Sequence, residues 1–196
     1  MLSDCSAKSE KRKHYKEILS KIVFSEQLKT SNKISNILYS RLYGTNKIIL
    51  SFFKIYNQNE IDLFPLNQML AVNNQLALPR VNRITKKLEC YLVEELQSLQ
   101  PQPPYNIYEP NPELHVKVPV GMLDIILTPG LAFDMNFQRL GRGKGYYDRL
   151  IRESRIECSK KMKNLEVIAV GHLVQLSEEL LPREDHDQSM DELILL

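Results

Sequence analysis

Hydrophobic residues in the first part of the chain recur at helical spacing. Apolar side chains fall every three or four positions from Tyr15 to Val23, and they do so again from Ile34 to Leu42. This spacing predicts two amphipathic helices, and Thr30-Ser31-Asn32, between the two stripes, is expected to break the helix or to cap the second one. Residues 47–53 are apolar, with β-branched and aromatic side chains, and they predict a buried strand.

Helical and strand-like patterns continue along the rest of the chain. The helical segments are 64–72, with Pro65 in the first turn, and 146–155. The strand-like segments are 76–79, 88–93, 123–127 and 167–170, the last of which is expected to be the final core strand. Five of the ten prolines lie in 101–112, which predicts a loop, and the C-terminal segment is expected to be mostly acidic loop with a short apolar end.

Apolar strands that alternate with amphipathic helices are typical of α/β proteins. We therefore expect residues 1–196 to form a single α/β domain of three layers, with a mostly parallel central sheet flanked by helices. The chain of 196 residues can bury a substantial core, and 43% hydrophobic and 26% charged residues are ordinary values for a globular protein.

Charge and cysteine content argue against several classes of protein. A net charge of +2 is too small for a generally basic nucleic-acid-binding protein, so any anion site should be local. Cys5, Cys90 and Cys158 are odd in number and form no C-x-x-C pair, so we expect neither a disulfide framework nor a zinc site. Neither a membrane span nor a secretory or transit peptide is indicated, and a cytoplasmic protein is expected.

The segment 139–148 is the most informative about function. It consists of Arg-Leu-Gly-Arg-Gly-Lys-Gly-Tyr-Tyr-Asp, and four of the seven glycines of the chain lie between Gly130 and Gly145. Glycine allows positive φ and close approach of the backbone to a ligand, and successive free N–H groups before a helix bind anions. The register matches neither a Walker A loop nor the G-x-G-x-x-G fingerprint. The segment therefore predicts a phosphate cradle, with a flexible basic surface loop as the alternative.

Two carboxylates are candidates for a Mg²⁺ site. Asp148 lies one turn into the helix that follows the glycines, and Asp187 lies near the C-terminus in Asp185-His186-Asp187. A carboxylate beside a triphosphate is a usual ligand for Mg²⁺, but an acid in the first turn of a helix is also favoured by the helix dipole. For His186 we expect a solvated loop position, because the four histidines are scattered along the chain.

Other charged residues have two interpretations on sequence alone. Lys11, Arg12, Lys13 and Lys16 precede the first helical stripe, and they form either a solvated face or a second set of positive charges over the phosphates. Glu60 follows a polar turn at the end of a strand. The simpler interpretation is a surface acid, and the functional one is a carboxylate that orients a ligand.

Residues 129–134 and 139–149 together resemble the signature of the 5-formyltetrahydrofolate cyclo-ligases, which are also called 5,10-methenyltetrahydrofolate synthetases. The first segment is Pro-Gly-Leu-Ala-Phe-Asp, and the second is the glycine-rich loop with Arg149. Weaker similarities follow in family order at Asn59-Glu60-Ile61-Asp62, Leu78-Pro79-Arg80-Val81, Tyr108-Glu109-Pro110 and Leu181-Pro182.

The resemblance implies an ATP- and Mg²⁺-dependent ring closure that converts 5-formyltetrahydrofolate to 5,10-methenyltetrahydrofolate, with release of ADP and phosphate. It implies that phosphoryl transfer activates the formyl oxygen and that N10 then attacks the formyl carbon. The expected partners are these two small molecules, ATP and the folate. We expect no nucleic acid, no membrane, and a monomeric protein.

The resemblance also implies roles for individual positions. Arg142 and Lys144 would act in catalysis, Asp148 and Asp187 would hold Mg²⁺, and Glu60 would bind the pterin edge. Arg12 and Lys16 keep the spacing of the family's Lys-x-x-x-Arg phosphate contacts with the residue types exchanged. The ATP-binding set would be Lys11, Arg12, Lys16, Arg139, Leu140, Gly141, Arg142, Gly143, Lys144, Gly145, Tyr146 and Tyr147. The folate-binding set would be Phe53, Ile55, Glu60, Arg142, Gly143, Lys144, Gly145 and Tyr146.

One departure and two alternatives remain open. The turn Met135-Asn136-Phe137-Gln138 lacks the glycine that the family usually has before Arg139, and Asn136 is expected to be the residue that can take positive φ there. The chain could instead be a catalytically degenerate module that binds a nucleotide or RNA, or an ATP-dependent ligase for another N-formyl or amide substrate. Asp148, Asp187 and Glu60 argue for an enzyme, because a pure phosphate-binding module would not need them.

Overall fold

The computed structural model of the chain describes residues 2–73, 75–104 and 106–196, with side chains from Ala7 onward. In these residues the strands of the central sheet are β1 (Ile49–Leu50), β2 (Leu76–Asn82), β3 (Lys87–Leu92), β6 (Lys117–Val118), β7 (Ile125–Thr128), β10 (Glu166–Gly171) and β12 (Glu192–Leu195). Their order across the sheet is β12-β10-β7-β1-β2-β3-β6. Neighbouring strands from β12 to β2 are parallel, whereas β3 and β6 are antiparallel to their neighbours. The predicted mostly parallel sheet is confirmed.

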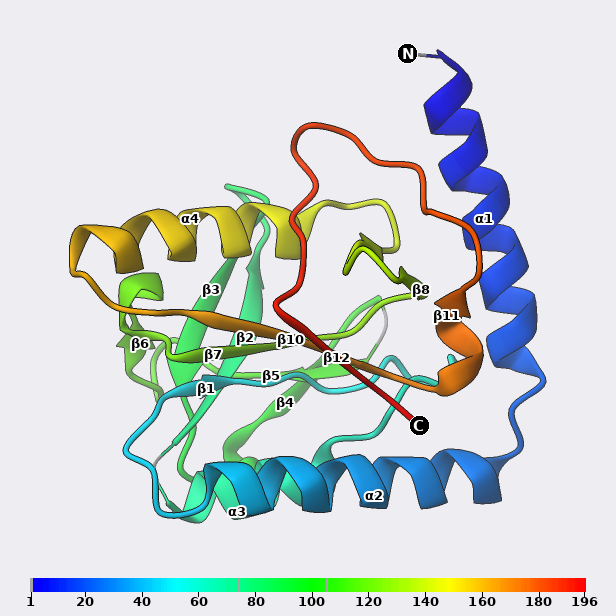
Figure 1. Cartoon of the computed structure of the whole chain (residues 1–196). Helices are drawn as coiled ribbons and strands as arrows, with labels where there is room; N and C mark the ends of the chain where they lie inside the picture. Colours follow the sequence, from blue (N-terminus) through cyan, green and yellow to red (C-terminus); the bar gives the residue numbers. More distant parts are fainter. Residues whose placement is uncertain (1, 74, 105) are drawn as a thin grey trace.

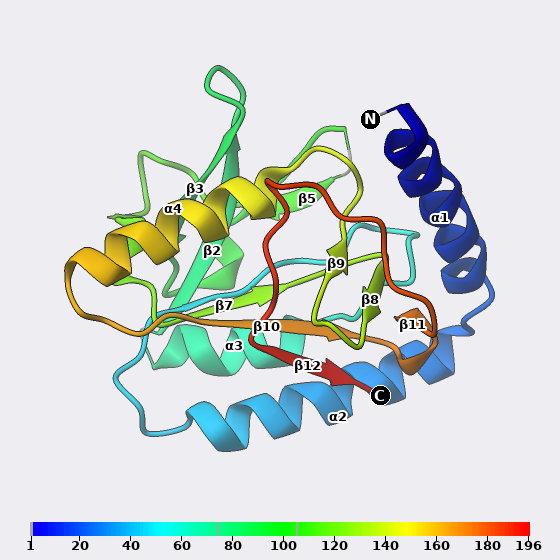
Figure 2. The ribbon, with the colours of Figure 1, turned by 45° about the horizontal axis from the view of Figure 1, so that its top comes forward.

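Helices cover both faces of this sheet. The two helices α2 (Phe24–Leu42) and α3 (Phe64–Val72) lie on one side, and α4 (Tyr146–Lys160) lies on the other, as Figures 1 and 2 show. Leu38 and Leu70 pack on one face of the sheet, and Leu150 and Ile151 pack on the other. Because both faces are buried, the central strand β1 is apolar at both of its positions. Ile49 and Leu50, which make up β1, are 0% exposed.

A fourth helix stands at one end of the sheet. This helix, α1 (Leu2–Ser20), packs Tyr15 and Leu19 against Leu131 and Leu140. Leu140 belongs to a small second sheet, and Leu131 immediately precedes it. The order of strands across this sheet is β11 (Leu176–Ser177), β8 (Ala132–Asp134) and β9 (Arg139–Leu140). Figure 1 shows α1 beside β8 and β11, on the opposite side of the molecule from β6.

The break between the first two helices does not lie where the polar residues predicted it. The helices end at Ser20 and begin again at Phe24, whereas Thr30 and Ser31 are buried inside α2. The Ser31 hydroxyl accepts a hydrogen bond from the backbone N–H of Asp62 at 2.9 Å, so its polar group is satisfied in the interior. Because α1 and α2 pack against different sheets, the chain turns at residues 21–23, at the end of the first apolar stripe, and α2 runs on through residues 30–32.

The C-terminal apolar end is a strand and not the end of a loop. This strand, β12, pairs in parallel with β10, with Ile168 opposite Glu192 and Val170 opposite Ile194. The predicted final core strand, 167–170, is therefore followed by one more. The proline-rich segment also contains secondary structure, since β4 (Gln100–Gln102) and β5 (Ile107–Glu109) form an antiparallel pair. Three short 3-10 helices in the described residues complete the secondary structure: η1 (Leu96–Ser98), η2 (Val120–Met122) and η3 (Leu173–Gln175).

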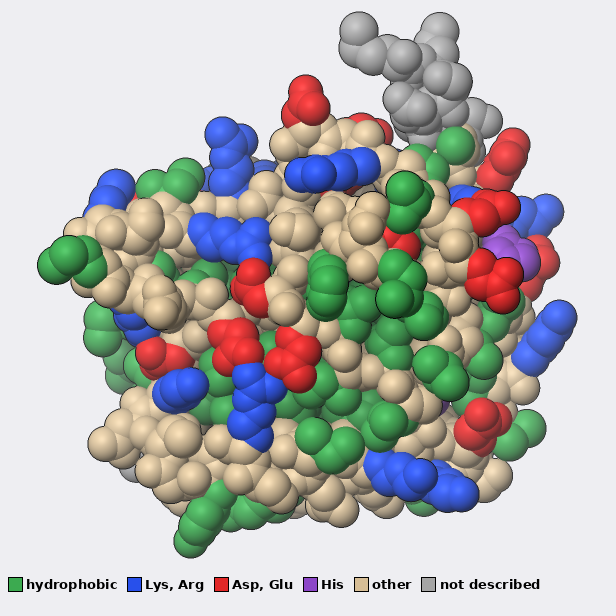
Figure 3. All heavy atoms as spheres, viewed as in Figure 1, with side chains coloured by type: hydrophobic (Ala, Val, Ile, Leu, Met, Phe, Trp, Pro, Cys, Tyr) green, Lys and Arg blue, Asp and Glu red, His purple; other side chains and the backbone are tan. Residues whose placement is uncertain are grey.

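The surface carries charges of both signs. On the face in Figure 3, Lys and Arg side chains are interspersed with Asp and Glu side chains, and hydrophobic side chains gather near the middle. In the part of the chain that the structure describes, no helix is long and apolar enough to cross a membrane. Cys90 and Cys158 are free and buried, and Cys5 lies outside the residues whose side chains are described.

Candidate active site

A cleft of about 920 Å³ brings together most of the residues that the sequence singled out. It opens beyond the carboxyl ends of β1 and β7, where ligands bind in open α/β sheets. Of the predicted residues, those that line it are Arg12, Phe53, Ile55, Glu60, Arg139, Leu140, Gly141, Arg142, Gly143, Lys144, Gly145, Tyr146, Tyr147, Asp148 and Asp187. Lys11 and Lys16 are not among the lining residues.

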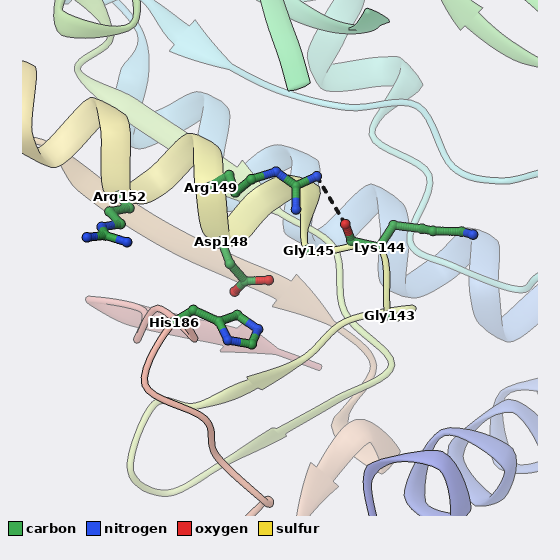
Figure 4. Close-up of a pocket in the computed structure, with 7 residues that line it drawn as sticks. All are labelled: Gly143, Lys144, Gly145, Asp148, Arg149, Arg152 and His186. Atoms are coloured by element: carbon green, nitrogen blue, oxygen red, sulfur yellow. Dashed lines mark hydrogen bonds between the residues drawn. The ribbon is translucent and has the colours of Figure 1, made fainter. Parts of the chain in front are cut away.

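The glycine-rich loop joins β9 to α4 along one wall of the cleft. Gly143 has φ +97° and Gly145 has φ +62°, in the left-handed region that other residues rarely adopt. Gly145 is the N-cap of α4, so the free N–H groups of the first helical turn face the loop. Figure 4 shows this bend, with the Arg149 guanidinium turned back to the Lys144 carbonyl, to which it donates at 3.1 Å. The loop has the backbone geometry of an anion site.

The turn before β9 forms without the glycine that the family usually has there. Its positive φ, +59°, falls on Phe137 and not on Asn136, so the expectation for Asn136 is wrong. The carboxylate of Asp134 accepts hydrogen bonds from the backbone N–H groups of Asn136 at 2.9 Å and Gln138 at 3.0 Å. Asp134 is 1% exposed, so these hydrogen bonds fix the turn from its buried side. The Phe137 carbonyl in turn accepts a hydrogen bond from Met190 N–H at 2.8 Å.

Asp148, a predicted metal ligand, is part of an ion pair. Arg139 Nη2 lies 3.1 Å from both Asp148 carboxylate oxygens, and the two side chains are 5% and 11% exposed. The Arg139 guanidinium also lies 5.5 Å from the centre of the Tyr147 ring. Burial raises the pKa of Tyr147, the nearby charge of Arg139 lowers it, and the first effect is larger, so this hydroxyl stays neutral. The pair fixes the start of α4 against β9.

Asp187 is paired with a lysine that sequence reasoning missed. Lys8 Nζ lies 2.6 Å from Asp187 Oδ2 and 3.3 Å from Glu184 Oε1, and all three residues line the cleft. Burial by itself would raise the pKa of Asp187, but the hydrogen bonds from Lys8 and from the Glu184 backbone, with the Lys8 charge, hold it below its ordinary value. As expected, His186 lies in an exposed loop, with its side chain 62% exposed.

Basic residues of α1 divide between the cleft and the outer surface. Arg12 Nε donates to the Gly141 carbonyl at 3.0 Å, which ties α1 to the glycine-rich loop. Lys11 Nζ lies 2.5 Å from Glu179 Oε2, outside the cleft, and Lys16 is exposed. Lys8 and Arg12 therefore keep the Lys-x-x-x-Arg spacing in the family's own residue order. That order was the signal in the sequence that could have selected Lys8 over Lys16.

The family's Lys-x-x-x-Arg phosphate contacts imply that Lys8 contacts ATP. On this hypothesis Lys8→Ala is expected to raise KM for ATP about tenfold, because it removes a charge-assisted contact of roughly 1.5 kcal/mol. Lys11→Ala is the matched control, since it removes the same charge from the other side of the same helix. Steady-state kinetics with ATP as the varied substrate checks both. Equal effects of the two substitutions would mean that α1 contributes only its overall charge.

Glu60 is buried and holds Arg142. It is 5% exposed, which excludes the simpler interpretation of a surface acid. Its Oε1 accepts from Arg142 Nε at 2.9 Å and from Arg142 Nη2 at 2.5 Å, and its Oε2 accepts from the backbone N–H of Ile55 at 2.9 Å. The Gln58 side-chain oxygen accepts from Arg142 Nη1 at 3.0 Å. Glu60 and Arg142, the arginine of the glycine-rich loop, are thus direct partners.

Aromatic side chains form the apolar wall of the cleft. The ring centres of Phe53 and Tyr108 are 5.8 Å apart, and those of Phe53 and Phe64 are 6.4 Å apart. Tyr108 is supplied by β5, within the segment that predicted only a loop, and it lines the cleft beside Glu109. Burial raises the pKa of Glu109, although a backbone hydrogen bond and the charges of Arg80 and Arg83 oppose the shift. The motif Tyr108-Glu109-Pro110 was recognised in the sequence, but the sequence did not predict that it lines the cleft.

The donor set at the cleft suits a Mg²⁺ ion that arrives with a nucleotide. Asp148 and Asp187 are carboxylates on the same cleft, and each already accepts from a cationic side chain. Among the described residues no group of three or more His, Cys, Asp or Glu side chains is arranged to hold a metal. Mg²⁺ is commonly held by one or two carboxylates together with phosphate oxygens and water, so two carboxylates are sufficient.

The chain is similar in sequence to a family profile and to proteins of the same name. The sequence profile of the 5-formyltetrahydrofolate cyclo-ligase family matches residues 4–195. The chain is 28% identical to the 5-formyltetrahydrofolate cyclo-ligase of Mus musculus over 180 residues, which cover 89% of this chain and 78% of the mouse protein. It is 25% identical to the Saccharomyces cerevisiae protein of the same name over 197 residues, with 92% and 90% covered.

Two solved structures have the same fold. The NMR structure of Aquifex aeolicus 5,10-methenyltetrahydrofolate synthetase superposes with a TM-score of 0.77 at 28% identity, and covers 96% of this chain and 89% of its own. The synthetase of Mycoplasma pneumoniae has a TM-score of 0.70 at 20% identity, with 95% and 97% covered, and it bears on the fold alone. Together the matches confirm the resemblance that the glycine-rich loop carries and the predicted fold class.

Proposed function

The chain belongs to the 5-formyltetrahydrofolate cyclo-ligase family, and from this premise we propose that it uses ATP to convert 5-formyltetrahydrofolate to 5,10-methenyltetrahydrofolate, releasing ADP and phosphate. The main support is the arrangement of the cleft. A phosphate-type loop and a wall with a buried carboxylate and aromatic rings open into the same space, so two different ligands can meet there.

The ATP half of the proposed site is the loop with its neighbours. The N–H groups of Gly141 to Gly145 and the start of α4 would bind phosphate oxygens, with the charges of Lys144, Lys8 and Arg12 around them. The Arg139 guanidinium is buried, is paired with Asp148 and also donates to the Pro129 carbonyl at 3.3 Å. We propose that Arg139 holds the loop in place and does not itself bind the nucleotide.

The folate half is the wall formed by Phe53, Ile55, Tyr108 and Glu60. A reduced pterin would lie against the aromatic rings, and its adjacent N–H donors would bind the two oxygens of the Glu60 carboxylate. This acid is buried and already accepts hydrogen bonds from Ile55 and Arg142, so its carboxylate group is oriented before a ligand arrives.

The proposed chemistry needs no nucleophilic side chain. The formyl oxygen of the folate is an amide oxygen and a poor leaving group. Its attack on the terminal phosphorus of ATP forms an O–P bond, breaks the bond to ADP and gives an iminium phosphate. Folate N10 then attacks the formyl carbon, loses its proton, and phosphate leaves with the former formyl oxygen. The residues of the loop would align the two substrates and stabilise the developing charge.

Mg²⁺ would be held by Asp148 and Asp187, where it would neutralise phosphate charge. The residues proposed for both substrates meet at one cleft of this chain, and we propose a monomer of one domain as the active unit.

The direct test is the ring closure itself. Purified protein with ATP, Mg²⁺ and 5-formyltetrahydrofolate is expected to develop the absorbance of 5,10-methenyltetrahydrofolate, with one ADP formed for each product. Folded protein that binds ATP but forms no product would favour the alternative, a degenerate nucleotide-binding module. Another N-formyl compound with a higher kcat/KM than the folate would favour a ligase of different specificity.

Glu60→Gln is expected to raise KM for the folate about 10- to 100-fold, because hydrogen bonds to a charged group contribute roughly 1.5–3 kcal/mol. Glu113→Gln is the matched control, since it removes a carboxylate from an exposed position that is not among the residues lining the cleft. Its KM for the folate is expected to stay within about twofold of the wild-type value. Steady-state kinetics with the folate varied measures both, and an unchanged KM in Glu60→Gln would remove this residue from the folate site.

A further inference from the structure

Gln58 has a contact with the proposed catalytic machinery that neither the sequence nor the family resemblance assigned to it. Its side-chain oxygen accepts a hydrogen bond from Arg142 Nη1 at 3.0 Å. The residue lies in the turn that leads from Phe53 to Glu60, with Asn57 and Asn59 on either side in the left-handed region, at φ +60° and +49°. Gln58 is therefore held at a defined place in a tight turn and does not lie in a mobile surface loop.

The turn itself is anchored to α1. The Asn59 side-chain amide donates to the carbonyls of Leu19 at 3.0 Å and Ile22 at 3.2 Å, at the end of that helix. Arg12, on the same helix, donates to the Gly141 carbonyl, next to Arg142. The turn that carries Gln58 and the loop that carries Arg142 are thus fixed to one common element, which sets the distance between them.

Arg142 is held along two edges of its guanidinium group. Nε and Nη2 both donate to Glu60 Oε1, and Nη1 donates to Gln58. The other Glu60 oxygen accepts from Ile55 N–H. Three donors therefore already occupy a carboxylate that offers about four acceptor sites. Both acceptor sites of Oε1 are taken by Arg142, so a pterin that binds both oxygens with two N–H donors must displace at least one of the two Arg142 donors from Oε1.

The displaced guanidinium would retain one partner. Because Gln58 is not among the described residues that line the cleft, its hydrogen bond to Nη1 can persist while Nε and Nη2 become available. A neutral amide suits this position, since it orients the guanidinium without neutralising the charge that the phosphoryl group needs.

We propose that Gln58 is a positioning residue, which keeps Arg142 between the two substrates when a folate takes the Glu60 carboxylate. This inference rests on the proposed function. Gln58 acts through Arg142 and not on the substrates, so its loss should lower kcat more than it changes either KM.

Gln58→Ala is expected to lower kcat about tenfold, the effect of one hydrogen bond to a charged group, with both KM values within about threefold of wild type. The matched control is Gln68→Ala, which removes an exposed glutamine of α3. Its kcat is expected to equal that of the wild-type enzyme. Thermal unfolding of both variants shows whether either substitution disturbs the fold. If Gln58→Ala does not fold, Gln58→Asn replaces it, because asparagine keeps the amide group on a shorter side chain.

A double-mutant cycle separates positioning from a general structural effect. In an Arg142→Ala background, Gln58→Ala is expected to change kcat by less than about twofold, because the group that Gln58 positions is gone. A tenfold loss in that background, or an unchanged kcat in Gln58→Ala alone, would overturn the positioning role while the wild-type turnover still supports the proposed function. Absence of ring closure by the wild-type enzyme would overturn the proposed function and this role with it.

Discussion

Lys144→Ala is expected to lower kcat/KM for ATP by about 100- to 1,000-fold, the usual loss when a group that stabilises transition-state charge is removed. Lys144 lies between the two glycines of positive φ, next to the N-terminus of α4. Within the residues that the structure describes, its ammonium group makes no ion pair, and Figure 4 shows the side chain extended away from α4. The charge is thus available to a ligand without first breaking a protein contact.

The control for Lys144 is Lys33→Ala, which removes an exposed lysine from α2, on the other side of the central sheet. Its kcat/KM is expected to match that of the wild-type enzyme. Lys144→Arg distinguishes charge from shape, because an arginine keeps the charge on a larger, planar group. If Lys144→Ala retained the wild-type kcat/KM with ATP varied, the phosphate site would have to lie elsewhere.

Asp148→Asn is expected to lower the free energy of unfolding by about 3 kcal/mol, because it leaves the buried guanidinium of Arg139 without its partner charge. The two side chains are 5% and 11% exposed, so solvent cannot replace the lost carboxylate. The same substitution is expected to raise the Mg²⁺ concentration needed for half-maximal activity. Urea unfolding measures the first effect, and a Mg²⁺ titration of activity measures the second.

A second substitution separates these two roles of Asp148. In Arg139→Met combined with Asp148→Asn both charges are gone, so most of the lost stability is expected to return. The Mg²⁺ requirement is expected to stay altered in this double variant, because the proposed ligand is still missing. Asp185→Asn removes the same charge from an exposed position two residues from Asp187, and it controls for long-range electrostatics. Recovery of the wild-type Mg²⁺ dependence in the double variant would show that Asp148 serves the fold and not the metal.

Local patterns in the sequence were reliable where neighbouring residues determine the structure. The helix at 64–72 was predicted at its observed bounds, because its apolar spacing and Pro65 act within a few residues. The glycine-rich loop was predicted for the same reason, since positive φ at Gly143 and Gly145 depends on the residue itself. The expected position of the neighbouring turn's positive φ was wrong, because the buried Asp134 carboxylate holds the turn and places that φ at Phe137.

Contacts between distant segments could not be predicted in this way. Arg142 and Glu60 are 82 positions apart, and Lys8 and Asp187 are 179 apart. Nothing in the residues around Glu60 indicates that it is buried, since burial depends on the loop that the rest of the fold brings against it. The strand β12 was missed because a short apolar end becomes a strand only when β10 offers it an edge to pair with.

The sequence by itself determined the fold class, the family and the loop that is proposed to bind phosphate, because these follow from spacing and from the conformational limits of single residues. Only the tertiary structure decided which charges face one another across the cleft. It selected Lys8 over Lys11 and Lys16, paired Asp148 with Arg139, and placed Gln58 beside Arg142. Such pairings depend on how whole elements pack, and packing brings together side chains that no local pattern connects.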